Sequence, residues 1–227
     1  MSKQADALHA LFARHADAAR APAMTAYMKG QFEFFGIGTP QRRALTREWL
    51  ADFGRQPDST LLLGVSEALW RFPERECQYA ACDLLAQHAA TLEPEFLEGL
   101  ATLADTKPWW DTIDTLAAKV FGTLARTHPE LVDTIVGWES ADSLWLRRVA
   151  ILHQLGYGSA TDTQRMARIL DANLDDRDFF IRKAIGWALR QYARTDPAWV
   201  RAYLASRSSR LSPLSHREAA KHLGDQA

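Results

Sequence analysis

The segment Leu144-Trp145-Leu146-Arg147-Arg148 indicates the fold class, because related segments recur before and after it. A bulky aromatic residue lies at Trp110, Trp145 and Phe180, each 35 residues after the one before. A basic residue follows at steps of 35 and 34, at Arg148, Lys183 and Arg217. A period of this length is typical of solenoids whose repeat is a pair of helices. The related segments are Pro108-Trp109-Trp110-Asp111, Phe179-Phe180-Ile181-Arg182-Lys183 and Leu214-Ser215-His216-Arg217.

The rest of the chain also predicts helices. Apolar residues recur at i, i+3, i+4 and i+7, and no alternating apolar and polar run indicates a strand. Proline, glycine and aspartate breaks divide the chain into about a dozen short helices. We therefore expect an all-α fold, an α-α superhelix of HEAT-like helix pairs that forms a single domain over residues 1–227. Its concave groove would carry the basic residues as a ladder, although protein-binding solenoids also have charged repeats. The breaks lie at Pro22, 36–38, 54–57, 72–73, 93–94, 107–108, 128–129, 156–158, 175–178, 196–197 and 212–213.

Composition places the chain among globular proteins. With 227 residues and 47% hydrophobic content, it can bury a core without disulfides or metal. Cys77 and Cys82 are five residues apart in one helical stretch, so they point away from each other and we expect both to be reduced. Neither a signal peptide nor a membrane-spanning run is found. We expect a cytoplasmic monomer.

Charge is unevenly distributed along the chain, although the net charge is only −1. Residues 1–139 carry 13 Lys and Arg against 19 Asp and Glu, whereas residues 140–227 carry 14 against 9. The second part, with a net charge of +5, could face a phosphate backbone. Scatter between solvated helix faces would give the same counts.

Trp110 and Asp114 form the first candidate site. They are four residues apart and share one flank of a helix, beside a core stripe. A half-buried Trp beside a solvated Asp is the alternative, and spacing alone favours it. Asp111 lies in the first turn, where the helix dipole favours an acid, so we assign it a structural role. The core stripe is Trp109, Ile113, Leu116, Val120 and Leu124.

Trp187 belongs to a second candidate site on a later helix. The core stripe of that helix is Ile181, Ala184, Ile185, Ala188 and Tyr192, and Trp187 lies off it among basic residues. Aromatic surface among cations is typical of nucleic-acid contacts, although Arg side chains packed over a Trp would look the same. The line of residues is Phe180, Lys183, Trp187, Arg190 and Arg194.

Arg148 lies among leucines and therefore needs an anionic partner. A DNA phosphate or an internal carboxylate such as Asp114 would each serve. No metal site is predicted, since no two of the scattered histidines have ligand spacing with a Cys or carboxylate. The segment Gly36-Ile37-Gly38-Thr39-Pro40 lacks the third glycine of a dinucleotide loop, and it predicts a Thr39 cap with Pro40 at the first helical position.

Over nearly its whole length the chain resembles the DNA alkylation repair family of HEAT-like DNA glycosylases, often called AlkD-like. The stretches that carry the resemblance are Met24-Thr25-Ala26-Tyr27-Met28-Lys29, Gly36-Ile37-Gly38-Thr39-Pro40-Gln41-Arg42-Arg43, Leu69-Trp70-Arg71-Phe72-Pro73-Glu74-Arg75-Glu76, Trp109-Trp110-Asp111-Thr112-Ile113-Asp114, Trp145-Leu146-Arg147-Arg148 and Lys183-Ala184-Ile185-Gly186-Trp187.

The resemblance implies hydrolysis of the N-glycosidic bond of cationic alkylated purines, such as 3-methyladenine and 7-methylguanine, in duplex DNA. It assigns catalysis to Asp114 with Trp110 and Trp187, DNA gripping to Arg148, and a place near the lesion to Tyr27. We add Lys183, Arg190 and Arg217 to the expected DNA contacts. The resemblance also suggests that the lesion stays in the duplex, unlike the usual base flipping. No cofactor is expected.

One carboxylate suffices for this chemistry, because a cationic purine leaves as a neutral base without the acid that other glycosidases need. The enzyme hypothesis requires Asp114 to lie near both indoles and to reach solvent rather than be closed off by its own arginine. Two rival hypotheses are a DNA-structure binder without catalysis and a protein-interaction solenoid.

Overall fold

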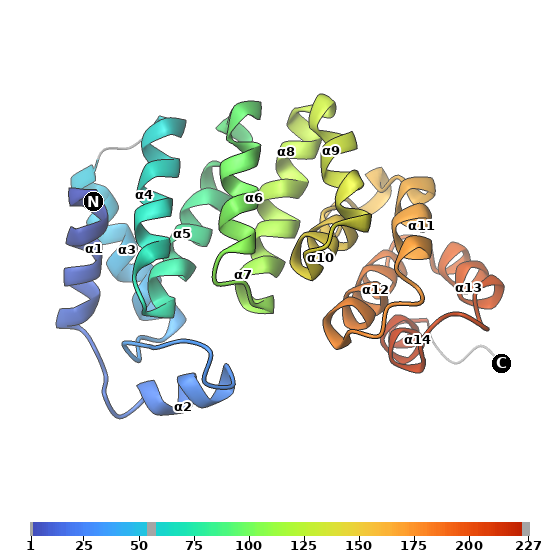
Figure 1. Ribbon diagram of the computed structural model, residues 1–227, viewed down its shortest axis with the longest axis horizontal. Coiled ribbons are helices and arrows are strands. Elements are labelled where there is room, and N and C mark those ends of the chain that lie inside the picture. Colours follow the sequence, from blue (N-terminus) through green and yellow to red (C-terminus); the bar gives the residue numbers. More distant parts are fainter. Residues whose placement is uncertain (1, 54–57, 224–227) are drawn as a thin grey trace. The chain divides into compact units, whose positions relative to one another are not determined.

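The computed structural model describes residues 2–53 and 58–223, and its regular structure there is helical (Figure 1). The only strand-type pairing in these ranges is an isolated parallel bridge between Glu33 and Glu74. The predicted all-α fold class is therefore confirmed. Within the described part of the chain, none of the helices is long and apolar enough to cross a membrane.

The chain divides into two compact units, Met1–Leu103 and Ala104–Ala227. The first contains α1 (Lys3–Arg14), α2 (Ala21–Tyr27), α3 (Thr39–Phe53), α4 (Ser59–Arg71) and α5 (Arg75–His88), and the boundary falls within α6 (Leu97–Asp105). The second contains α7 (Trp110–Thr115), α8 (Gly122–Thr127), α9 (Val132–Gly137), α10 (Leu144–Leu152), α11 (Thr163–Ala172), α12 (Phe179–Tyr192), α13 (Pro197–Ser206) and α14 (Pro213–Ala220). The predictions of one domain and of a concave groove stay predictions.

Short helical segments complete these units. A π-helical segment, Leu116–Phe121, joins α7 to α8. The 3-10 helices are Ala89–Thr91, Pro94–Phe96, Pro129–Leu131, Trp138–Ser140 and Gly158–Ala160. Neighbouring helices pack in pairs, of which α4 with α5 and α12 with α14 are clear in Figure 1.

Helices begin where the sequence supplies a capping side chain. The Asp178 carboxylate accepts hydrogen bonds from the backbone N–H groups of Phe180 and Ile181 at the start of α12. Asp196 and Ser212 cap α13 and α14 in the same way. Each is followed by a proline, which has no backbone N–H group that would need a partner in the first turn. The predicted break at residues 54–57 lies outside the described residues. Helix α3 includes Thr39 itself, one residue earlier than predicted.

The 36–38 segment in the first unit is held by a carboxylate of the protein itself. Backbone N–H groups of Phe35, Gly36 and Ile37 donate to Glu76 at 3.1, 2.9 and 3.0 Å, and Glu76 is fully buried. Gly36 has a φ of +90°, a conformation that L side chains rarely adopt. These contacts stabilise the loop that connects α2 to α3.

Both predicted core stripes of the second unit are buried except at one end of each, Trp109 and Tyr192, which are half-buried. Ile113, Leu116, Val120 and Leu124 have no solvent exposure, and Ile181, Ala184, Ile185 and Ala188 lie in the core, with Tyr192 half-buried. In the first unit, Cys77 and Cys82 are free and buried, as predicted.

Trp109, one residue before the position that the 35-residue spacing gives, packs against the aromatic residues of the following repeats. Its ring centroid lies 5.8 Å from that of Trp145 and 5.0 Å from that of Phe180. Trp109 is the residue before α7 and has an extended backbone, which turns its side chain inward. The 35-residue spacing therefore identifies the repeat, but the tryptophan that packs on Trp145 and Phe180 is Trp109, one residue before the position that the spacing gives.

Candidate functional site

A pocket of about 320 Å³ in the second unit brings together most of the predicted site residues. Helix α7 contributes Trp110 and Asp114, which are one turn apart, and α10 contributes Arg148. Helix α12 contributes the face that carries Trp187. The residues lining the pocket are Trp110, Asp114, Arg148, Phe179, Phe180, Lys183, Trp187 and Arg190.

Asp114 and Arg148 form a two-point ion pair inside this pocket. The Arg148 Nε and Nη2 atoms donate to the two carboxylate oxygens at 2.8 and 3.0 Å, and Nη1 donates to the Phe180 carbonyl. The Arg148 side chain is only 4% exposed. Of the two partners that the sequence left open for Arg148, the internal carboxylate is the one observed.

Burial raises the pKa of the Asp114 carboxyl, and the hydrogen bonds and charge of Arg148 oppose that rise. The charge of nearby Asp111 acts in the same direction as burial. Arg148 therefore supplies the main interaction that favours the ionised carboxylate.

The Asp114 carboxylate still reaches the pocket. Its side chain is 17% exposed, and the two hydrogen bonds from Arg148 use only two of about four lone-pair positions on a carboxylate. A water molecule or a substrate atom can therefore contact it. Asp114 thus lines one pocket with both indoles, and it is paired with its arginine without being sealed from solvent.

Lys183 and Arg190 also have an internal partner, Glu218 on α14. The Lys183 Nζ atom lies 2.6 Å from one Glu218 oxygen, and Arg190 Nη1 lies 2.9 Å from the other. Sequence reasoning missed Glu218, although it lies 35 residues after Lys183, one repeat further on.

The three basic residues of the predicted ladder differ in their surroundings. Arg148 is buried against Asp114, Lys183 is paired with Glu218, and Arg217 is exposed and lies outside the pocket. The difference arises because acids from other helices, Asp114 and Glu218, pair with the first two. Tyr27 belongs to the first unit, where it is 68% exposed on α2.

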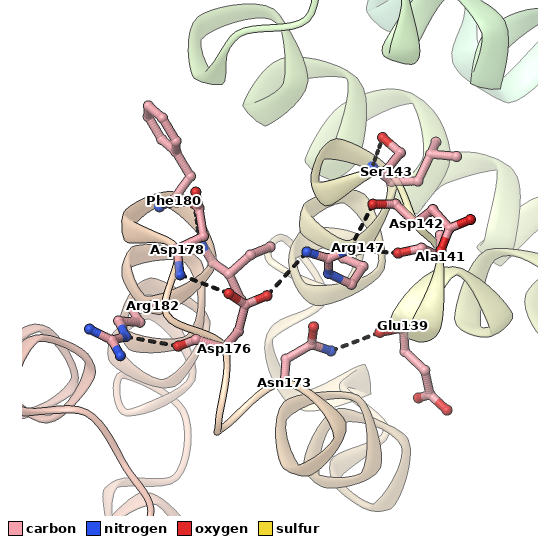
Figure 2. A network of polar contacts seen from close by, with 12 residues as sticks. Glu139, Ala141, Asp142, Ser143, Arg147, Asn173, Asp176, Asp178, Phe180 and Arg182 are labelled. Atoms are coloured by element: carbon pink, nitrogen blue, oxygen red, sulfur yellow. Dashed lines mark hydrogen bonds and ion pairs between the residues drawn. The ribbon is translucent and has the colours of Figure 1, made fainter.

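A polar network beside the pocket fixes the start of α12 (Figure 2). Arg147 donates to the carbonyls of Ala141 and Asp142 at 2.6 and 3.0 Å and to the Asp176 carboxylate at 3.1 Å. The other Asp176 oxygen accepts from the backbone N–H of Asp178, which caps α12. Helix α10 is thereby tied to the end of α12 that carries the pocket's two phenylalanines.

Phe179 is a pocket residue to which sequence reasoning gave no role. It is 56% exposed, and its ring packs edge-on against that of Phe180, with centroids 5.4 Å apart. Only its place in the repeated segment could have drawn attention to it. Among the residues that the structure describes, no group of three or more His, Cys, Asp or Glu could hold a metal ion.

Comparisons with known proteins agree with the fold and identify the family. The family model described as DNA alkylation repair enzyme matches residues 8–223. A solved structure, described as a predicted DNA alkylation repair enzyme from Enterococcus faecalis, is similar with a TM-score of 0.85 and 35% identity. That similarity covers 93% of this chain and 98% of that one.

The smu.31 protein from Streptococcus mutans UA159 shares the fold, with a TM-score of 0.61 and 16% identity over 79% of this chain and 91% of that one. No curated protein matches the sequence. Because the family model covers almost the whole chain, the protein belongs to the DNA alkylation repair enzyme family.

Proposed function

We propose that the protein is a monofunctional DNA glycosylase that hydrolyses the N-glycosidic bond of cationic alkylated purines in duplex DNA. The observation that carries this proposal is the shared pocket of Trp110, Asp114 and Trp187, in which the carboxylate keeps some exposure. The 3-methyl and 7-methyl purines are the proposed substrates. The protein would act as a monomer without a cofactor.

The proposed reaction uses the positive charge that the damaged base already has. As the bond from the sugar carbon to the base nitrogen breaks, its electron pair neutralises the base, and positive charge develops on the deoxyribose. Asp114 would stabilise that charge, and the faces of Trp110 and Trp187 would add cation–π attraction. A water molecule held by the free lone pairs of Asp114 then attacks the sugar carbon and releases its proton to the solvent. No general acid and no covalent intermediate are needed.

Base release from methylated duplex DNA tests the proposal. We expect Asp114→Asn to lower the single-turnover rate at least 100-fold, as for removal of one group that stabilises transition-state charge. Asp171→Asn is the matched control, because Asp171 also accepts two hydrogen bonds from an arginine, at 3.1 and 2.8 Å from Arg207, and lies outside the pocket. Equal 7-methylguanine release by wild type and Asp114→Asn would refute the catalytic role.

A second candidate function is DNA binding without base release. The observation in its favour is that both oxygens of Asp114 are bonded to Arg148. This function predicts binding to duplex DNA in a band-shift experiment together with no release of any alkylated base. A protein-interaction solenoid would show no duplex affinity.

Of the basic residues proposed to contact DNA phosphates, Arg217 is exposed, whereas Arg148 is buried and Lys183 and Arg190 are half-buried. Each phosphate contact contributes about −0.9 to the slope of log affinity against log salt concentration. Arg217→Met is therefore expected to make that slope shallower by about 0.9. An unchanged slope would exclude this residue from the DNA interface.

A further inference from the structure

Glu218 gathers three cations around one nearly buried carboxylate. One oxygen accepts from Lys183 at 2.6 Å and from Lys221 at 2.8 Å, and the other accepts from Arg190 at 2.9 Å. The Glu218 side chain is 7% exposed, whereas those of Lys183 and Arg190 are 38% and 26% exposed. The cluster therefore has three positive charges and one negative charge, and the negative charge is the Glu218 carboxylate on its buried side.

Close packing between α12 and α14 keeps Glu218 in this place. A Cβ atom added at Gly186 would lie 2.5 Å from the Glu218 Cβ and 2.8 Å from the Ser215 carbonyl oxygen, so only glycine allows this approach. The Ser215 hydroxyl also donates to the Arg182 carbonyl at 2.8 Å. Helix α14 is thus fixed against α12, and the backbone and Cβ of Glu218 are held beside the helix that carries the two pocket cations.

The two cations lie on either side of Trp187 in the sequence of α12, and all three side chains line the pocket. An arriving DNA phosphate would have to share Lys183 and Arg190 with a carboxylate that already binds them at short range. Charges held in an ion pair attract a second anion less strongly than free charges.

We propose that Glu218 is a positioning residue of the DNA-binding pocket, which holds Lys183 and Arg190 beside Trp187 and weakens their contact with DNA phosphates. This inference rests on the proposed function, because it requires the pocket to face DNA. The neighbouring lysines lower the pKa of Glu218 to about 2, so the carboxylate keeps its charge at every pH used for DNA binding.

The test measures the affinity for an undamaged duplex by fluorescence anisotropy at 50 and 200 mM salt. Glu218→Gln keeps the size of the side chain and removes its charge. We expect tighter binding and a salt slope steeper by about 0.9 to 1.8, for one or two additional phosphate contacts. Each contact increases the ratio of the two dissociation constants about threefold. A residue with a merely structural role would not tighten binding.

Two further variants separate this effect from a general change in charge. Glu139→Gln is the matched control, since Glu139 pairs with Arg168, is 15% exposed and lies outside the pocket. We expect its slope to equal that of wild type. The double variant Glu218→Gln with Lys183→Met should lose about one of the added contacts. Equal slopes for Glu218→Gln and wild type, or equal increases for Glu218→Gln and Glu139→Gln, would overturn the inference.

A single substitution of Lys183 gives a result that does not depend on the folding of Glu218→Gln. Because Glu218 already restrains Lys183, we expect Lys183→Met in the otherwise wild-type protein to make the salt slope shallower by less than half of the value for one phosphate contact. A slope that becomes shallower by about 0.9, the value for a full contact, would overturn the inference. Duplex binding without base release would refute the proposed catalysis and leave this inference standing. A wild-type protein that does not bind duplex DNA would refute both.

Discussion

Replacing Arg148 with Met tests the energetic role of the Asp114–Arg148 pair. The substitution keeps an apolar stem of similar length and removes both hydrogen bonds to the carboxylate, which lie at 2.8 and 3.0 Å. Removing one partner of a buried ion pair typically costs about 3–5 kcal/mol, because the other charge stays buried without compensation. With side chains 4% and 17% exposed, the pair belongs to this class. We therefore expect a loss of about 3–5 kcal/mol in unfolding free energy at pH 8.

The loss should become smaller as the pH falls. In the folded protein the pKa of Asp114 is raised by burial, and Arg148 opposes that rise. A raised pKa means that the folded state binds the proton more tightly than the unfolded state, so the stabilising contribution of Asp114 is complete at low pH and is lost as pH rises through the folded pKa. Without Arg148 this pKa rises further, and each unit changes the folding free energy by about 1.4 kcal/mol. Protonation of Asp114 therefore reduces the deficit as the pH falls.

Urea unfolding followed by circular dichroism between pH 5 and 8 measures this difference. Arg207→Met is the matched control, because it removes a two-point pair with Asp171 whose side chains are both 32% exposed. Such a partly exposed pair is worth roughly 0–1 kcal/mol, so the deficit of the control is expected to be small throughout this pH range. A deficit for Arg148→Met that equals the control, or that does not change with pH, would refute the assignment of Arg148 as the group that keeps Asp114 ionised.

Two further predictions concern stability alone. Gly186→Ala should destabilise the protein by about 1–3 kcal/mol, because the new Cβ would overlap Glu218 and the Ser215 backbone. Gly64→Ala, where no atom lies within 4 Å of the added Cβ, should instead stabilise α4 by up to about 1 kcal/mol. Thermal melting compares the two, and equal melting temperatures would contradict the close packing of α14 on α12. His153 is buried, its Nδ1 atom lies 2.7 Å from the Ala150 carbonyl, and burial lowers its pKa to about 4. Because the unfolded chain binds the proton first, stability should fall by about 3 kcal/mol as pH drops from 6.5 to 4. Urea unfolding at several pH values checks this, and a His153→Gln variant with the same pH dependence as wild type would contradict it.

Local signals predicted the helices well, because each depends on residues close together in the sequence. Asp178 caps α12, and Pro197 and Pro213 begin α13 and α14, as the breaks in the sequence indicated. The apolar stripes identified the buried faces of the helices that carry Asp114 and Trp187. The inward turn of Trp109 was not predictable in this way, since it depends on the extended backbone before α7 and on contact with later repeats.

The convergence of the site followed from the period and the family resemblance, but its charge state did not. Trp110, Asp114 and Trp187 line one pocket, as the enzyme hypothesis requires. For Arg148 the sequence left a DNA phosphate and the Asp114 carboxylate as alternative partners, and for Lys183 it named no partner, because the charge count for 140–227 says nothing about which acids lie beside these cations. The side chains that neutralise these cations come from other helices, so no helical spacing identifies them.

The repeat length contains the information that the charge count lacks. When consecutive repeats stack, a side chain faces its equivalent position one repeat away, and ion pairs between repeats should therefore be separated by about one period. Four observed pairs agree: 34 residues for Arg148 with Asp114, 35 for Lys183 with Glu218, 36 for Arg207 with Asp171 and 35 for Arg210 with Asp175. Three others are shorter, at 28 residues for Arg190 with Glu218 and 29 each for Arg147 with Asp176 and Arg168 with Glu139. The residues 34, 35 and 36 positions before Arg217 are Lys183, Arg182 and Ile181, and none of them is an acid. Arg148 and Lys183 each pair with an acid one period away, whereas the positions one period before Arg217 hold no acid and Arg217 is exposed, so this comparison favours Arg217 as the cation available to DNA.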